Sequence, residues 1–536
     1  MNGISRRGLL TWSALTGSAV ASGALVTPGL ATASTAPDHS RTSPITTVGP
    51  SDPRYPALTR GQNQRWVSTP EQVHIPRTTK EVVTAVSKAV SSGKKISVRS
   101  GGHCYENFVD RPDVQVIIDM SQMTAIDWDS AKSAISVEAG APLGDVYYTL
   151  FKRWGITLPG GSCYTVCAGG HVLGAGYGGL SREHGLISDH LYAVEVVVAD
   201  ENGVRAVTAT REQGDPNRDL WWAHTGAGGG SFGIVTRYWF RSPQGGSTPK
   251  TALPAPPREV WVHRSQWAWK DMTQAGFTRL LRNYGSWLED NSATGSPYTG
   301  LFSRLELTTV GSGAFHLVVQ MDAGKPDAEA LLNAFLAAVN AGVGVQATVT
   351  DHRRMPWLHA SGWPGMWMSN PTDRYKYKSS FHRRGFTDAQ ISAFYEKLTA
   401  TDYAQPPFVV SIASYGGRIN TLAPGDTAHA HRDSVMLLLW GTAWQSSADD
   451  DLHLGWHQDF YRAVYADTGG VPVPNENTDG CFINYCDIDL SDGGLNTSGV
   501  AWHDLYYKEN YARLQQVKQN WDPDDVFRHA QSIRLP

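Results

Sequence analysis

Residues 159–181 read PGGSCYTVCAGGHVLGAGYGGLS, a stretch that fits neither a regular helix nor a regular strand. It holds eight glycines, and each would destabilise a helix or strand by about 0.5–1 kcal/mol relative to alanine. Glycines in a loop instead let successive backbone N–H groups approach an anion closely. The stretch therefore predicts a loop that cradles a diphosphate group.

Two further glycine-rich segments support this prediction. Residues 99–103 read RSGGH, and residues 226–233 read GAGGGSFG. A P-loop Gly-Lys-Ser/Thr is missing, and no GxGxxG follows the first strand, so ATP and a nicotinamide cofactor are disfavoured. For any one segment alone, glycine-rich tight turns in a secreted β-protein are the alternative interpretation.

The first half of the chain is predicted to be an α+β unit. Thr78 and Glu81 form a capping box before an apolar helical face that ends near Gly93. The Asn202-Gly203 pair predicts a β-hairpin. Other strands are expected at residues 96–98, 114–118 and 134–138.

A linker rich in proline and glycine follows this unit. Residues 242–257 read SPQGGSTPKTALPAPP, which predicts a domain boundary. The region beyond it is expected to form a sheet with helices on one face and a substrate pocket on the other. The hydrophobic pattern predicts strands at 315–321 and 435–440 and helices at 326–341, 388–398 and 506–519.

The first residues resemble an export signal. Arg6-Arg7 precedes a weakly apolar stretch of small residues, and Ala31-Thr32-Ala33 is a cleavage signal. Serine, threonine and glycine interrupt the apolar stretch, which disfavours a membrane anchor. Twin-arginine export carries folded proteins, often with a bound cofactor, so we expect a secreted protein whose residues 1–33 are removed.

Composition excludes several classes of protein. The 536 residues carry 46 lysines and arginines against 50 acidic residues, which leaves no positive field for nucleic acid. The chain has neither a disordered nor a membrane-protein composition. The 54 glycines, 19 tryptophans and 21 tyrosines favour aromatic pockets that would hold sugars or planar rings.

The chain has five cysteines, an odd number for an exported protein: Cys104, Cys163, Cys167, Cys481 and Cys486. Neither closely spaced pair has a histidine at zinc-finger spacing, so we expect no metal site.

Together these motifs resemble the berberine bridge enzyme-like flavoprotein oxidases, over about residues 62–536. The matching segments are RSGGH at 99–103, GSCYTV at 161–166, GGH at 169–171, GYG at 176–178, the run at 228–233 and FINY at 482–485. The resemblance implies an α+β fold of the vanillyl-alcohol-oxidase type. A two-lobed FAD-binding domain is joined to a substrate domain whose antiparallel sheet is covered by helices. The expected parts are the FAD-binding domain (34–246), the substrate domain (247–490) and a segment returning to the FAD-binding domain (491–536).

The resemblance also implies FAD bound covalently twice. His103 would bond to the flavin C8 methyl group and Cys163 to flavin C6, which leaves four cysteines whose pairing stays open. The remaining implied cofactor-binding residues are Arg99, Ser100, Gly101, Gly102, Thr165, Gly169, Gly170, His171, Gly176, Gly178, Gly229, Gly230, Gly233, Val235 and Asn484. His171 is either structural or close to the flavin.

The resemblance places a catalytic tyrosine at Tyr485, which would take the substrate hydroxyl proton. A phenol of ordinary pKa near 10 is a weak base at neutral pH, so it needs a partner that stabilises the phenolate. Tyr177 and Tyr415 are the candidates. Trp357, Trp363, Trp367 and Trp440 either stack on the substrate or belong to the core.

By a rough alignment, Leu439 falls where plant members that form carbon–carbon bonds carry Glu or Gln. We therefore expect an oxidase of a sugar, glycosylated polyketide or similar secondary alcohol, which reduces O2 to H2O2 after hydride transfer to flavin N5. The alternative is oxidative cyclisation or C–N oxidation of a secondary metabolite; a non-catalytic carbohydrate-binding module is a weaker one. A small-molecule substrate and molecular oxygen are the expected partners, without nucleic acid or membrane, in a monomer or homodimer.

Overall fold

The computed structural model describes residues 44–363, 371–403 and 408–536. Residues Ile45–Pro536 form one unit with three β-sheets. The expected signal segment, residues 1–33, and Trp367 lie outside the described residues. Among the described helices, none has the length and apolar character needed to cross a membrane.

A four-stranded sheet begins this unit, in the order β1-β2-β4-β3. Its strands are β1 (Thr46–Val48), β2 (Gln72–Ile75), β3 (Ile96–Arg99) and β4 (Val116–Asp119). β2, β3 and β4 pair in parallel, and the helix between β2 and β3 is α2 (Thr79–Ser91). The Thr78 side chain accepts from the Glu81 N–H, as the capping box predicts. β3 delivers the RSGGH loop at its carboxyl end.

A five-stranded antiparallel sheet follows, in the order β5-β6-β9-β7-β8. Its strands are β5 (Ile126–Asp129), β6 (Ala134–Glu138), β7 (Leu191–Asp200), β8 (Gly203–Thr210) and β9 (Ile234–Phe240). Asp200 pairs with Gly203, so the predicted Asn-Gly hairpin is confirmed. The long glycine-rich loop lies between α3 (Leu143–Trp154) and β7, with only short helical turns in it, including α4 (Ala168–His171).

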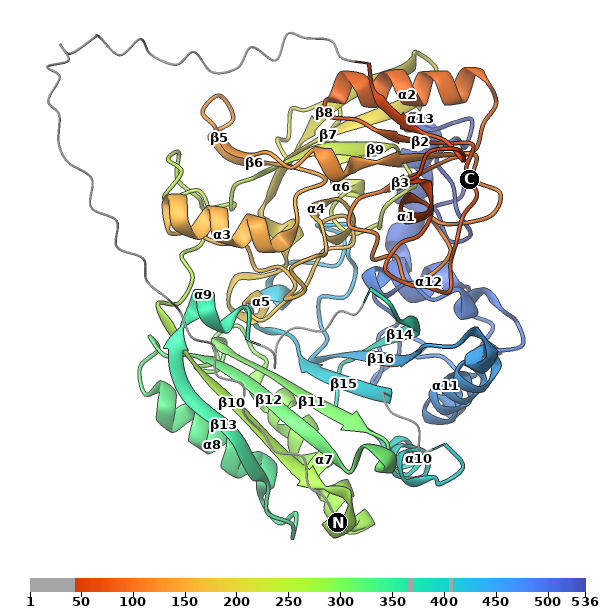
Figure 1. The fold of residues 1–536 in the computed structure, drawn as a ribbon. Coiled ribbons are helices and arrows are strands. Elements are labelled where there is room, and N and C mark those ends of the chain that lie inside the picture. Colours follow the sequence, from red (N-terminus) through yellow and green to blue (C-terminus); the bar gives the residue numbers. More distant parts are fainter. Residues whose placement is uncertain (1–43, 364–370, 404–407) are drawn as a thin grey trace, which may run out of the picture. The chain divides into compact units, whose positions relative to one another are not determined.

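The third sheet has seven antiparallel strands in the order β13-β10-β12-β11-β15-β16-β14. Four helices cover one face (Figure 1), as predicted. The strands are β10 (Glu259–Ala268), β11 (Leu301–Thr308), β12 (Ala314–Asp322), β13 (Thr348–Pro356), β14 (Arg374–His382), β15 (Phe408–Ser414) and β16 (Met436–Trp444). The helices are α7 (Gln274–Asn291), α8 (Ala328–Asn340), α10 (Asp388–Thr399) and α11 (Asp450–Val464). Trp357, Trp363 and Trp440 are buried in the core.

The C-terminal segment differs from the single helix expected at 506–519. It forms α12 (Trp502–Tyr507) and α13 (Tyr511–Trp521), separated at Lys508, whose φ of 50° lies in the left-handed region. The Lys508 ammonium group pairs with the buried carboxylate of Asp479, and this ion pair accompanies the break. α13 packs against β7 and α6 (Arg218–Ala223). The three domain boundaries stay predictions.

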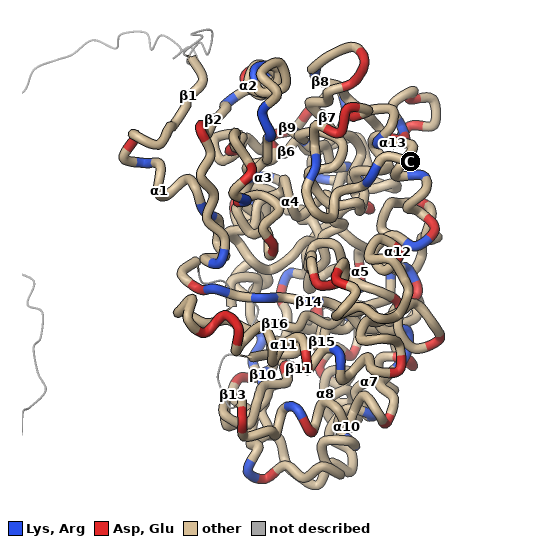
Figure 2. The backbone as a smooth tube through the Cα atoms, turned by 90° about the vertical axis from the view of Figure 1, so that its right-hand side faces the viewer, with Lys and Arg blue, Asp and Glu red and all other residues tan. Residues whose placement is uncertain are grey.

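Charged residues of both signs are interspersed along the chain (Figure 2). Many form ion pairs, such as Lys95 with Asp113 at 2.9 Å.

Candidate active site

A cavity of about 380 Å³ lies between the glycine-rich loops and the uncovered face of the seven-stranded sheet. The sheet contributes alternate residues of neighbouring strands, which therefore share one face: Phe302, Arg304, Tyr377, Val409, Ser411, Ala413, Leu437 and Leu439. Most of the predicted cofactor-binding residues also line the cavity, on the loops and at the adjoining ends of β3 and β9: Arg99, Ser100, Gly101, Gly102, His103, Cys163, Gly169, Gly170, His171, Gly178, Gly229, Gly230, Gly233, Val235 and Asn484. Thr165, Gly176 and Tyr415 do not line the cavity.

Thr165 lies behind the two predicted attachment residues and contacts both. Its hydroxyl lies 3.0 Å from His103 Nε2 and 3.7 Å from Cys163 Sγ. Burial lowers the pKa of His103 to about 4, so its imidazole is neutral at pH 7 and one ring nitrogen keeps a lone pair. The imidazole and the thiol thus reach the cavity from separate loops that a single hydroxyl connects.

Several glycines are required because a side chain would collide with the protein. A Cβ on Gly178 would lie 1.8 Å from the Gly160 carbonyl oxygen, and one on Gly101 would lie 2.8 Å from that of Thr165. Gly230 has a φ of 78°, which side chains other than glycine rarely adopt. These positions let the loops pack closely around the cavity.

Gly170 is different, because a Cβ there would meet no protein atom within 4 Å. Gly170 is exposed and lines the cavity. Bare backbone is therefore available for a ligand to approach, as the predicted cradle requires. The residues present fit a bound dinucleotide with a diphosphate group.

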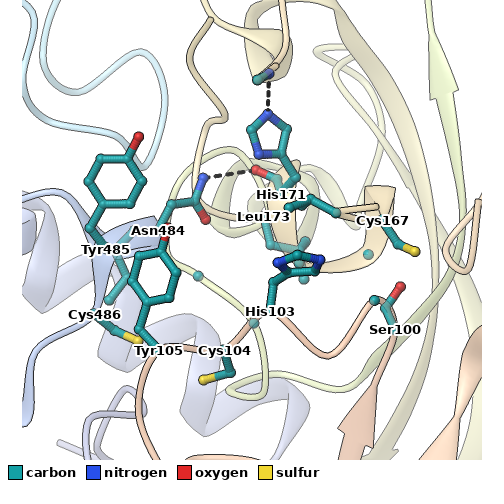
Figure 3. Close-up of a pocket in the computed structure, with 18 of the residues that line it drawn as sticks. Ser100, His103, Cys104, Tyr105, Cys167, His171, Leu173, Asn484, Tyr485 and Cys486 are labelled. Carbon is teal, nitrogen blue, oxygen red and sulfur yellow. Dashed lines mark hydrogen bonds between the residues drawn. The ribbon is translucent and has the colours of Figure 1, made fainter. Parts of the chain in front are cut away.

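His171 and Gly176 hold the long loop together. The Gly161 N–H donates to His171 Nε2 at 2.9 Å, and Asn484 Nδ2 donates to the His171 carbonyl oxygen at 3.0 Å (Figure 3). Burial lowers the pKa of His171 to about 4, which keeps Nε2 available as an acceptor. A Cβ on Gly176 would collide with the His171 ring. The geometry thus gives His171 a structural contact.

Arg99 and Ser100 use their side chains within the protein. Arg99 Nη2 pairs with buried Asp119 at 2.8 Å, and Nη1 pairs with Asp110 at 3.3 Å. Ser100 Oγ donates to the Ala139 carbonyl oxygen at 2.6 Å. These bonds hold the RSGGH loop at the end of β3.

The three candidate tyrosines lie in different positions. Tyr485 lines the cavity, and burial raises its pKa to about 12 while the Arg304 charge lowers it. Tyr177 also lines the cavity, but its hydroxyl donates to the Ser414 carbonyl oxygen. Tyr415 lies behind Tyr177, with ring centroids 5.3 Å apart. Its hydroxyl forms a hydrogen bond with His429 Nε2 at 3.0 Å.

The comparisons with known proteins agree with this architecture. Residues 70–206 match the model described as FAD binding domain, and residues 481–534 match the model described as berberine and berberine like. The chain is 49% identical to the aclacinomycin-N/aclacinomycin-A oxidase of Streptomyces galilaeus, covering 90% of this chain and 89% of that protein. It belongs to the berberine bridge enzyme-like FAD-linked oxidases.

Other family members are similar along nearly their whole length. The hexose oxidase of Chondrus crispus is 31% identical, over 90% of this chain and 93% of that protein. The crystal structure of a glycopeptide hexose oxidase complexed with teicoplanin is 46% identical, with a TM-score of 0.88 over 92% of this chain and 99% of that chain. The resemblance, the fold class and the assignment as an FAD-dependent oxidase are thus confirmed.

Among the cavity residues that sequence reasoning did not assign to the site are Cys104, Tyr105, Arg304, Tyr377 and Cys486. Cys104 and Tyr105 directly follow RSGGH, and Cys486 directly follows Tyr485, so adjacency was an available signal. Arg304 and Tyr377 occupy cavity-facing positions of β11 and β14. Arg304 is the one arginine of the strand sequence LFSRLELT, but the face of the sheet to which its side chain points depends on the strand register.

Proposed function

We propose that this family member oxidises a secondary alcohol of a sugar or glycoside with molecular oxygen. The observation that carries the proposal is the position of Tyr485. Its phenol lines the same cavity as His103 and Cys163, and the Arg304 charge lowers its pKa. The names of the relatives support the substrate class, because they include oxidases of an aclacinomycin and of hexoses.

The residues proposed to hold FAD are His103 and Cys163 by covalent bonds and the glycine loops by backbone contacts. When bound, FAD supplies the hydride acceptor at N5 and reacts with O2 to release H2O2. The neutral imidazole of His103 is in the form that can bond to a carbon atom. The contact of Thr165 with both attachment side chains supports attachment at both sites.

Tyr485 is proposed to accept the proton of the substrate hydroxyl. Its phenol is protonated at neutral pH, because burial raises its pKa to about 12. The Arg304 charge lowers the pKa of Tyr485, so this guanidinium stabilises the phenolate that proton abstraction requires. Tyr177 positions the cavity wall through its bond to Ser414, and Tyr415 supports the Tyr177 ring from behind.

Leu439 favours alcohol oxidation over oxidative ring closure. This residue lines the cavity on β16 and offers no proton-accepting group. The nearby Ser411 hydroxyl is suited to a hydrogen bond with a sugar hydroxyl, and the Arg304 guanidinium in the same cavity wall pairs with Glu306 at 2.7 Å. We also propose twin-arginine export and removal of residues 1–33, on the basis of the Arg6-Arg7 pair and the Ala31-Thr32-Ala33 cleavage signal.

A substrate panel with the purified protein tests this function. Glucose, other hexoses and a glycosylated polyketide are offered under air, and H2O2 is measured together with the product. A ketone or lactone with stoichiometric H2O2 is the expected result. A new ring in the product would favour the cyclisation alternative, and no H2O2 from any glycoside would contradict the proposal.

A further inference from the structure

Two cysteines meet in the cavity wall, at the positions that follow the proposed tether and the proposed base. Cys104 follows His103, Cys486 follows Tyr485, and both cysteines line the cavity. In Figure 3 their sulfur atoms point toward each other. We propose that Cys104 and Cys486 are a dithiol pair that H2O2 converts reversibly into a disulfide. This inference rests on the proposed function, because that reaction supplies the peroxide inside the same cavity.

The segments that carry the two thiols run side by side. The rings of Tyr105 and Tyr485 are stacked with centroids 5.8 Å apart. The Ile488 N–H donates to Glu106 Oε1 at 3.4 Å, which joins the two segments. Cys104 contributes to the raised pKa of the Cys486 thiol, which agrees with the two thiols being neighbours. A disulfide requires two neighbouring backbones with facing Cβ atoms, and this arrangement supplies the neighbouring backbones.

The remaining cysteines have other neighbours. Cys167 Sγ contacts the Thr165 carbonyl oxygen at 3.8 Å, and Cys481 Sγ lies 3.6 Å from the Tyr461 hydroxyl. Cys163 Sγ lies beside the Thr165 hydroxyl and is assigned to the flavin. The parity of the five cysteines is then resolved as one flavin bond, one thiol pair and two single thiols.

The two thiols have different exposure, which sets their order of reaction. Cys104 is half-buried, whereas Cys486 is buried. Contact with Cys104 and burial raise the pKa of the Cys486 thiol well above its ordinary value. Cys104 is therefore the attacking group and Cys486 the resolving group.

The chemistry balances with one molecule of peroxide. Cys104 sulfur attacks one peroxide oxygen, the O–O bond breaks, and the other oxygen leaves as water with the thiol proton, giving a sulfenic acid. Cys486 sulfur then displaces the hydroxyl group: the S–S bond forms, the S–O bond breaks, and a second water leaves with the Cys486 proton. Two thiols lose two electrons, and one peroxide becomes two waters. The disulfide joins the end of the RSGGH loop to the segment that carries Tyr485.

The experiment counts thiols in the complete protein. The purified holoprotein is incubated with or without H2O2, denatured without reductant, alkylated with N-ethylmaleimide and digested for mass spectrometry. With H2O2, we expect a cross-linked peptide that joins Cys104 to Cys486, lighter by two hydrogens than the two free peptides, and loss of both alkyl groups. Dithiothreitol should restore both. The peptide that contains Cys163 reports the flavin separately in the same digest.

Variants distinguish this pair from other thiols. Cys104→Ser should abolish the cross-link and leave Cys486 alkylated. Cys486→Ser should also abolish it but leave Cys104 as a sulfenic or sulfinic acid, and Cys167→Ser should keep the cross-link. Full alkylation of both thiols after H2O2, or sulfinic acid at Cys104 with alkylated Cys486, would overturn the inference. A cross-link in protein without flavin on Cys163 would support the thiol pair and contradict the proposed attachment.

Discussion

Thr165 connects the two proposed attachment residues, although its own side chain does not line the cavity. Its hydroxyl contacts His103 Nε2 and Cys163 Sγ, so each side chain is positioned by the same group. Each attachment should therefore form without the other, because loss of one partner leaves the other contact in place.

His103→Ala and Cys163→Ala test this independence. Each single variant should keep a covalent flavin through the remaining bond, and the double variant should release its flavin on denaturation. The measurement is the absorbance and mass of the acid-precipitated protein. A double variant that stays yellow after denaturation would show that another residue holds the flavin.

Tyr485 and Arg304 make a second prediction at this scale. Tyr485→Phe removes the proton acceptor and should lower kcat by about 10²–10⁴-fold. Because the Arg304 charge lowers the pKa of Tyr485, Arg304→Met should raise that pKa and shift the rising limb of the kcat/KM–pH profile to higher pH.

Arg304→Lys is the matched control, since it keeps the positive charge. Its pH profile should stay closer to that of the natural protein, even if substrate binding weakens. Equal shifts for the Met and Lys variants would contradict an electrostatic role for this guanidinium.

At the scale of residues, the sequence could reveal Tyr485 and His103 because both lie in short motifs with a local signature. Arg304 could not be placed, because its relation to Tyr485 depends on the pairing of β11 within the sheet. The position of Tyr415 could not be predicted for the same reason. Its motif is local, but its place behind Tyr177 depends on a tertiary contact between the two rings.

Among the elements, the glycine-rich loop has the least tolerance for side chains. Gly178→Ala places a Cβ 1.8 Å from the Gly160 carbonyl oxygen, so the loop must move. We expect a loss of stability of about 1–3 kcal/mol and less flavin incorporated per protein. Gly455→Ala in α11 is the control, because its Cβ meets nothing within 4 Å and alanine favours a helix by about 1 kcal/mol. Denaturant unfolding and the flavin-to-protein absorbance ratio check both variants.

Elements whose signals are local were predictable, and those that depend on distant partners were not. α2 was found because its cap and apolar face lie within a few residues of one another. The helix expected at 506–519 is interrupted at Lys508, where the ammonium group reaches Asp479, 29 positions earlier in the chain. No periodicity within the segment reports that ion pair.

Across the whole molecule, one enclosed charge cluster joins three distant segments. Glu106 follows the RSGGH loop, Lys376 and Lys378 lie in β14, and Asp487 and Asp489 follow Tyr485. Lys376 Nζ pairs with Asp487 at 2.7 Å, and Lys378 Nζ pairs with Asp489 at 2.5 Å. The Lys376 and Glu106 side chains are each only 1% exposed.

Removing one member should therefore affect the site and the fold together. Burial opposes the charge of Lys376, but Asp487, Glu106 and Asp489 hold its pKa above the ordinary value. Lys376→Met leaves three enclosed carboxylates with one ammonium group, and we expect a loss of about 3–5 kcal/mol in the free energy of unfolding. Lys270→Met, at a side chain that is 80% exposed, should leave the unfolding midpoint close to that of the natural protein. Since Glu106 and Asp487 flank the cavity segments, Lys376→Met should also lower the flavin content, and an unchanged midpoint with full flavin content would contradict a joint role.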